Sequence, residues 1–222
     1  MNSGPVRFAL RLILTIVALA FWFWSQSLLG ARTAQVNGIG DGLHNLTAPA
    51  NAYLHAHPLA ADTLLIASSA IIDALGLFLL AGWLFGKSVR PFLGLFLLMI
   101  LRQFMQALCP LPPPPGMIWH HPGVPSLLVT YKVASDFFFS GHTAIAVFAA
   151  TELVRLKKNW LTLFGIVVAL FEIFAVIVLR AHYTMDVFTG ILAALFIAAH
   201  VERLAAPIDR FLMPRQAHRA DV

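Results

Sequence analysis

The chain has 222 residues, of which 59% are hydrophobic and only 11% are charged. This composition is too apolar for an ordinary soluble domain and is typical of an integral membrane protein. The net charge of +5 does not indicate nucleic-acid binding, because the basic residues lie in short segments between apolar blocks and mark membrane topology. With Cys109 as its single cysteine, the chain cannot form an intramolecular disulfide.

Six apolar blocks approach or exceed the length of about 20 residues that a membrane-spanning helix needs. We therefore expect an all-α, six-transmembrane-helix bundle that forms a single integral membrane domain over residues 1–222. The first block is longer than the hydrophobic region of a signal peptide, which has about 7–15 residues, so we predict an uncleaved first span. The predicted spans cover residues 8–30, 61–86, 91–109, 140–156, 160–180 and 183–203.

The basic residues predict the orientation of these spans. If the amino terminus is cytoplasmic, 11 of the 15 Lys and Arg residues lie on the cytoplasmic side, as the positive-inside bias requires. Both termini are then cytoplasmic, and the two long loops, about residues 31–60 and 110–139, face the periplasm or a lumen. The first loop is predicted to hold a short interfacial helix near residues 43–54, whereas the prolines at 112–115 favour a stiff, extended path in the second.

Two short polar motifs open predicted spans on the external side. The fourth span begins with the letters SGHT at residues 140–143, and the sixth with HYTMD at residues 182–186. On a helix, His182 and Asp186 share one face, so the carboxylate can accept a hydrogen bond from one ring nitrogen. The other nitrogen would then present its lone pair outward, as attack on phosphorus requires. We predict His182 as nucleophile and Asp186 as its orienter.

Attack by His182 would form a phosphohistidine and expel an alkoxide, which is a poor leaving group unless it is protonated. His142 suits this task, because an imidazole titrates near pH 6.5 and can first give a proton and then take one. Ser140 and Gly141 open the same span, where free backbone N–H groups and the helix dipole favour phosphate oxygens. His142 is therefore predicted as general acid/base, with Ser140 and Gly141 as phosphate-binding positions.

A metal site is the alternative use of the external histidines. Their spacing lacks a ligand pattern, so we expect no metal and no other cofactor. The histidines concerned are His44, His55, His57, His120 and His121.

At these motifs the chain resembles the sphingomyelin synthase branch of the type 2 phosphatidic acid phosphatase superfamily, over about residues 95–200. Besides SGHT and HYTMD, the likeness rests on Asp136, which three residues separate from the SGHT motif, and on Arg102, which eight residues separate from an LPPP run. The chain is equally similar to plant enzymes that exchange phosphocholine between phosphatidylcholine and diacylglycerol. The resemblance implies six spans, an external active site, no metal cofactor and a catalytic triad of His142, His182 and Asp186.

Further polar residues near the membrane edge are candidates for substrate binding. Arg102 lies within the third span, where a cation is usually functional; it either holds a phosphate or pairs with Asp73. Arg180 stands within one turn of His182, and it either binds phosphate or extends to the interface.

Three more residues could receive the lipid head group. Asp136 and Tyr183 could attract a cationic group by charge and cation–π contact, although aromatic residues here also form lipid-facing belts. Glu172 lies deeper, where it either lines a head-group chamber or makes a structural hydrogen bond.

We predict a membrane lipid phosphotransferase that moves a phosphocholine- or phosphoethanolamine-type group from a phospholipid to diacylglycerol or ceramide through a phosphohistidine. Hydrolysis by the same triad, as in a lipid phosphate phosphatase or a phospholipase C, is the close alternative. A non-catalytic lipid-binding protein is the alternative from another class. The expected partners are lipid substrates and the bilayer, and the sequence carries no signal for an oligomeric state.

Overall fold

The computed structural model describes residues 3–31, 39–131 and 137–212. Within these ranges the regular secondary structure is entirely helical, which confirms the predicted all-α class. The helices are α1 (Ser3–Gly30), α2 (Gly42–Leu46), α3 (Ala48–Ala56), α4 (Pro58–Leu84), α5 (Arg90–Leu108), α6 (Gly141–Arg155), α7 (Asn159–Val178) and α8 (Thr184–Leu212).

The helix boundaries follow the apolar blocks closely, with two differences. The single interfacial helix predicted near residues 43–54 is two helices, α2 and α3, which meet at Thr47. Pro49 lies in the first turn of α3, where its missing N–H is tolerated, but it could not continue α2. At the other end of the chain, α8 runs to Leu212 and so extends past the predicted end at residue 203.

Five of the described helices are long and apolar enough to cross a membrane, namely α1, α4, α5, α7 and α8. This is consistent with a multi-pass membrane protein. The predicted fourth span corresponds to α6, which has 15 residues. At 1.5 Å per residue α6 is about 22 Å long, which is shorter than the roughly 30 Å of a hydrocarbon core.

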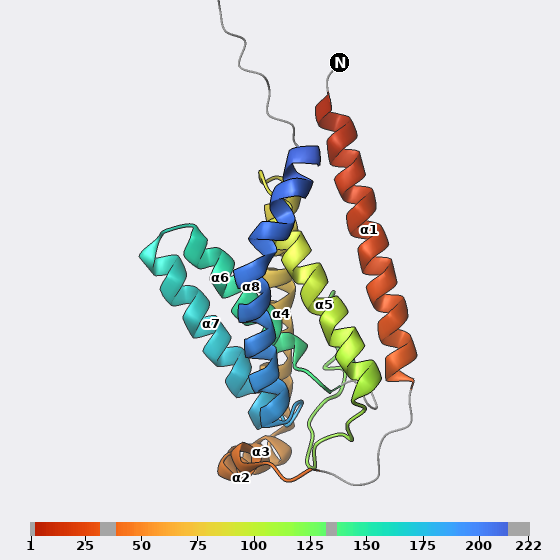
Figure 1. Ribbon diagram of the computed structural model, residues 1–222. Helices are drawn as coiled ribbons and strands as arrows, with labels where there is room; N and C mark the ends of the chain where they lie inside the picture. Colours follow the sequence, from red (N-terminus) through yellow and green to blue (C-terminus); the bar gives the residue numbers. More distant parts are fainter. Residues whose placement is uncertain (1–2, 32–38, 132–136, 213–222) are drawn as a thin grey trace, which may run out of the picture.

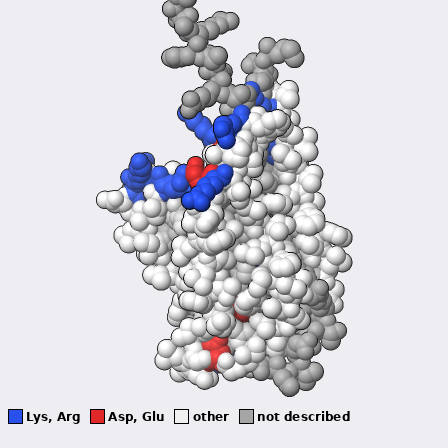
Figure 2. Space-filling model, viewed as in Figure 1, with Lys and Arg blue, Asp and Glu red and all other residues white. Residues whose placement is uncertain are grey.

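The long helices are arranged so that both ends of the described chain lie at one end of the bundle (Figure 1). The short helices α2 and α3 and the segment between α5 and α6 lie at the opposite end. Figure 2 shows Lys and Arg side chains gathered at the end that holds the termini. The apolar blocks of the sequence therefore form the long helices, and Lys and Arg residues gather at one end of the bundle.

Helix α6 packs at the centre, against α7, α8, α4 and α5. Two glycines on its neighbours allow this close packing. A Cβ atom at Gly94 of α5 would lie 2.0 Å from the Phe148 ring, and one at Gly190 of α8 would lie 2.9 Å from the Ser140 carbonyl oxygen. The start of α6 is thereby held against the first turns of α8.

A buried ion pair joins α5 to α6 at the end of the bundle that holds the termini. Arg90 pairs with Glu152, and its Nε also lies 3.0 Å from a carboxylate oxygen of Glu202 on α8. The side chain of Glu152 is 8% exposed, whereas that of Glu202 is 55% exposed. Loss of the Glu152 contact should therefore destabilise the protein more than loss of the Glu202 contact, because an unpaired charge at the buried position cannot be solvated.

We expect Glu152→Gln to lower the free energy of unfolding by about 3 kcal/mol, because it leaves the buried Arg90 guanidinium poorly compensated. The matched change Glu202→Gln should lower it by about 1 kcal/mol or less, since that carboxylate is largely exposed. Unfolding of the purified protein in mixed detergent, followed by circular dichroism, measures both. An equal loss of unfolding free energy in the two variants would contradict the greater importance of the buried Arg90–Glu152 pair.

Candidate functional site

His182 lies in the turn that precedes α8, and its ring is oriented by a backbone carbonyl. Nδ1 lies 2.8 Å from the Phe137 carbonyl oxygen. A carbonyl oxygen only accepts, so Nδ1 carries the hydrogen and Nε2 is left with a lone pair. The carbonyl oxygen of His182 is in turn 2.9 Å from Nε2 of His44, which anchors the backbone of the same residue. His182 thus has the tautomer that nucleophilic attack needs.

The predicted hydrogen bond between His182 and Asp186 is not formed. The hydrogen bond from Nδ1 of His182 to the Phe137 carbonyl takes its place. Oδ2 of Asp186 lies 3.7 Å from Nδ1 and instead accepts the Tyr183 N–H at 2.8 Å. The prediction assumed that both residues lie on one helix, but α8 begins only at Thr184, so helical spacing does not apply to His182. Asp186 closes the first turn of α8 in the manner of a capping box, and its negative charge still lies close to the His182 ring.

The start of α6 is built on Ser140. Its Oγ accepts the Thr143 N–H at 3.3 Å, and its own N–H donates to the Asp186 carbonyl oxygen at 3.1 Å. The side chain of Ser140 therefore caps the helix. The backbone N–H groups of Gly141 and His142 lie in the first turn of α6, where no carbonyl oxygen of the helix can accept from them. They are therefore available to an anion.

One cavity brings together Arg102, Gly141, His142 and His182. Its volume is about 50 Å³. The His142 ring is buried, and its Nε2 has no hydrogen-bond partner among the described residues. The edge of that ring meets Trp119, with the ring centroids 5.4 Å apart. The cavity therefore holds two histidines, each with a ring nitrogen that no described protein atom engages.

Arg102 places a cation at the start of α6. Its Nε donates to the Phe139 carbonyl oxygen at 2.9 Å, and Nη1 donates to Oε1 of Gln26 at 3.1 Å. The guanidinium lies so near Gly141 that a Cβ atom there would be 3.2 Å from Nε. Asp73, the partner considered for Arg102, accepts hydrogen bonds from Ser126, Leu127 and Leu128.

Three of the other predicted binding residues, Arg180, Tyr183 and Glu172, are not among the described residues that line this cavity. Arg180 donates to the carbonyl oxygens of Pro115 and His44, at 2.6 and 3.3 Å. The Tyr183 hydroxyl accepts the Ile39 N–H at 3.3 Å, and Glu172 accepts a hydrogen bond from Ser68 at 2.6 Å. Asp136 lies outside the described residues. Phosphate or head-group roles for these four residues stay predictions.

Asp41 and His44 belong to the site's framework, although the sequence pattern did not single them out as such. Asp41 caps α2 and also accepts the N–H and the hydroxyl of Thr184, at 2.5 and 2.6 Å. Burial alone would raise the pKa of Asp41, but these hydrogen bonds from Thr184, with those at His44, hold it below its usual value. The Asp-Gly pair before α2 was the available signal, since Asp is a preferred helix cap.

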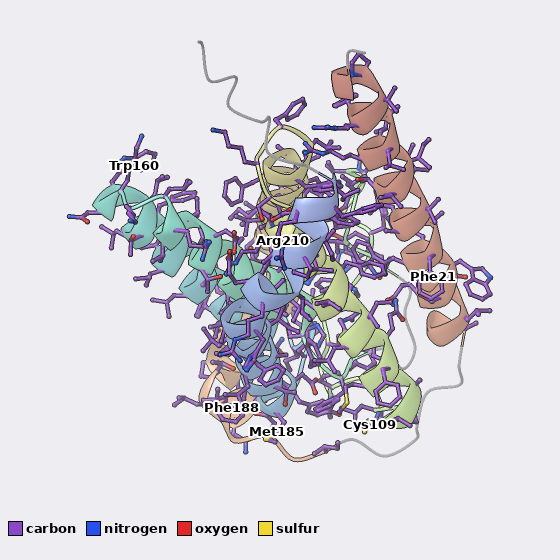
Figure 3. All side chains as sticks on the ribbon, turned by 45° about the horizontal axis from the view of Figure 1, so that its top comes forward. Phe21, Cys109, Trp160, Met185, Phe188 and Arg210 are labelled. Carbon is purple, nitrogen blue, oxygen red and sulfur yellow. The ribbon has the colours of Figure 1, made fainter. Side chains whose placement is uncertain are left out.

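The outer face of α8 is apolar in the first turns of the helix. Figure 3 shows Met185 and Phe188 pointing away from the bundle, and both are more than half exposed. Asp186, between them in sequence, is fully buried. The first turns of α8 therefore present lipid-compatible side chains outward and the polar group of the motif inward.

The chain matches the model of a known protein family. The model of the AtPDCT1/2 family, the plant phosphatidylcholine:diacylglycerol cholinephosphotransferases, matches residues 41–203. No curated protein matches the chain. The matched range begins just before α2 and includes His142, His182 and Asp186, whereas likeness to the sphingomyelin synthase branch stays a prediction. Since the match extends over more than half of the chain, this protein belongs to the AtPDCT1/2 family.

Proposed function

We propose that this protein transfers phosphocholine from phosphatidylcholine to diacylglycerol through a phosphohistidine on His182. The observation that carries the proposal is the single cavity lined by both His142 and His182, with the Phe137 carbonyl holding His182 in its nucleophilic tautomer. Membership of the AtPDCT1/2 family favours these substrates over ceramide or a phosphatidic acid.

The first half-reaction transfers the head group to the protein. Nε2 of His182 attacks phosphorus, and the bond from phosphorus to the glycerol oxygen breaks. Protonated His142 gives its proton to that oxygen, so diacylglycerol leaves as a neutral alcohol. Phosphocholine is then bound to His182 through a P–N bond, and Nδ1 stays hydrogen-bonded to the Phe137 carbonyl.

The second half-reaction reverses these roles. Neutral His142 takes the proton from the hydroxyl of an incoming diacylglycerol, whose oxygen attacks phosphorus. The P–N bond breaks, and phosphatidylcholine leaves with the new acyl chains. Arg102 and the first N–H groups of α6 would bind the phosphate oxygens, where added charge in the transition state is stabilised by fixed donors. Asp186 would stabilise the positive charge that forms on the His182 ring, 3.7 Å from its carboxylate.

We further propose six membrane crossings, with α6 as the fourth, in a bundle like that of the type 2 phosphatidic acid phosphatases. Both ends of the described chain lie at the same end of the bundle, and an even number of crossings is required for that (Figure 1). The concentration of Lys and Arg at this end supports a cytoplasmic location for both termini (Figure 2). The cavity then opens on the external side.

The proposal is tested with the purified protein in liposomes of phosphatidylcholine, with and without radiolabelled diacylglycerol. We expect label to appear in phosphatidylcholine, and only when both lipids are present. Free phosphocholine formed without diacylglycerol would indicate a hydrolase. No product in either mixture would favour the non-catalytic role, and both of these results contradict the proposal.

We expect His182→Ala to abolish transfer and also the covalent labelling of the protein by phosphatidylcholine with a labelled choline. The reason is that the variant has no nitrogen to form the P–N bond. Gels of samples quenched with detergent at alkaline pH measure the label, which should be lost on acid treatment, as expected of a phosphoramidate. Retained labelling would remove His182 from this role.

His142→Ala should slow transfer from phosphatidylcholine by about 10² to 10⁴, the usual contribution of a general acid/base. Labelling of His182 by a phosphocholine ester of nitrophenol should be nearly normal, because that leaving group needs no proton. The matched control His120→Ala removes an exposed histidine that pairs with Asp62, and it should leave both rates unchanged. If the nitrophenyl ester is slowed as much as phosphatidylcholine, His142 is not the acid.

Asp186→Asn should lower kcat by about 10²-fold while the midpoint of thermal unfolding changes little. Asn keeps an oxygen that can accept the Tyr183 N–H, so the first turn of α8 is preserved and only the charge beside the imidazole is lost. Wild-type kinetics in this variant would show that the carboxylate serves the helix cap alone.

A further inference from the structure

A groove lies on the outer face of α4, beside the segment between α5 and α6. Its α4 wall consists of side chains three or four residues apart, which share one helix face. The opposite wall is formed by Pro122, Val124 and Pro125. The groove has a volume of about 320 Å³. The apolar side chains of the α4 wall are Ile66, Ala70, Ala74 and Leu77.

This groove adjoins the reaction cavity through a third hollow that lies between them. Pro125 lines both the groove and this hollow, and Val129 lines both the hollow and the cavity. Tyr131, which also lines the hollow, has its ring 5.3 Å from that of Trp119. Because Trp119 in turn contacts His142, a series of contacts leads from the α4 groove to the proposed acid/base.

The segment 126–128, which directly follows the wall formed by Pro122, Val124 and Pro125, is held in place by Asp73 of α4. Its carboxylate accepts the N–H groups of Leu127 and Leu128, both at 2.8 Å, and the Ser126 hydroxyl. Leu128 fits over Gly76, where a Cβ atom would lie 2.1 Å from Cδ1. Non-helical backbone next to a membrane-spanning helix needs such partners, because lipid offers none. This segment is therefore a built part of the fold.

The chemistry of the groove fits an uncharged lipid. Along α4 it lies about 12 to 28 Å from the start of the helix, a depth that falls within a hydrocarbon core. Its polar groups are Ser69 and Asp73, and no Lys or Arg is found among its described lining residues. A phosphate would be disfavoured beside Asp73, whereas Arg102 supplies a cation in the cavity.

We propose that this groove, defined by Ile66, Ala70, Ala74, Leu77, Val124 and Pro125, binds the acyl chains of the lipid alcohol that accepts phosphocholine. The acceptor would lie with its chains along α4 and its hydroxyl toward Tyr131 and His142. The donor phospholipid would place its phosphate by Arg102. This inference rests on the proposed function for the identity of the acceptor, while the groove and its chemistry are independent of it.

A kinetic test fills the groove with an indole ring. Ala74→Trp should raise the apparent KM for diacylglycerol by about tenfold, the effect of excluding two methylene groups from burial. Labelling of His182 by phosphatidylcholine should be unchanged, because it needs no acceptor. Ala81→Trp is the matched control, since Ala81 is an exposed alanine two turns farther along α4 and outside the groove. Leu77→Trp provides a second groove variant in case Ala74→Trp folds poorly.

A binding test distinguishes failure of this inference from failure of the proposed function. Diacylglycerol with a diazirine in its acyl chain is photolysed with the full-length protein in liposomes, and the labelled peptides are identified by mass spectrometry. We expect labelling of residues 66–77 and 122–125 that is lost in Ala74→Trp and kept in Ala81→Trp.

Labelling that is equal in both variants, or slowed phosphatidylcholine labelling with an unchanged KM for diacylglycerol, would overturn the inference. A groove labelled as expected in a protein without transfer activity would overturn only the proposed function.

Discussion

The contact between the start of α6 and the first turns of α8 is the constraint on which the site depends. Two hydrogen bonds make it, one from the Ser140 N–H to the Asp186 carbonyl and one between the Phe137 carbonyl and Nδ1 of His182. Both connect residues about 45 positions apart in the chain. The absence of a side chain at Gly190 permits the approach. His142 and His182 can line one cavity because this contact sets the distance between their backbones.

Three charged side chains of the bundle bind backbone atoms. Arg102 binds the Phe139 carbonyl, Asp73 binds two amide groups of the second loop, and Asp186 binds the Tyr183 amide. In an apolar bundle an unpaired charge is strongly unfavourable, so each charged side chain needs a partner nearby. The same contacts fix the loops, whose own amides and carbonyls would otherwise lack partners. Arg102 therefore binds a loop carbonyl and lines the cavity at the same time.

The cavity contains cationic and imidazole side chains that the described lining of the α4 groove lacks. The cavity has Arg102 and two histidines, whereas the groove has aliphatic side chains and one engaged carboxylate. A phosphotransfer between two lipids needs both environments, because phosphate and its charge must be bound apart from water while acyl chains stay in an apolar phase. The segment 126–129 separates the two surfaces and is held to α4 by Asp73.

The sequence by itself determined the helices and the residues of the motifs. Apolar blocks predict helices one at a time, since each must satisfy its own backbone and present apolar side chains to lipid. Only the tertiary structure decided that the Phe137 carbonyl rather than Asp186 holds His182, that Asp41 and His44 anchor the turn, and that Arg180 binds loop carbonyls. These contacts join distant loops through backbone atoms that every residue carries. Residue identity can therefore suggest a capping side chain such as Asp41, but it does not name the distant partner, for which the packing of α6 against α8 had to be known first.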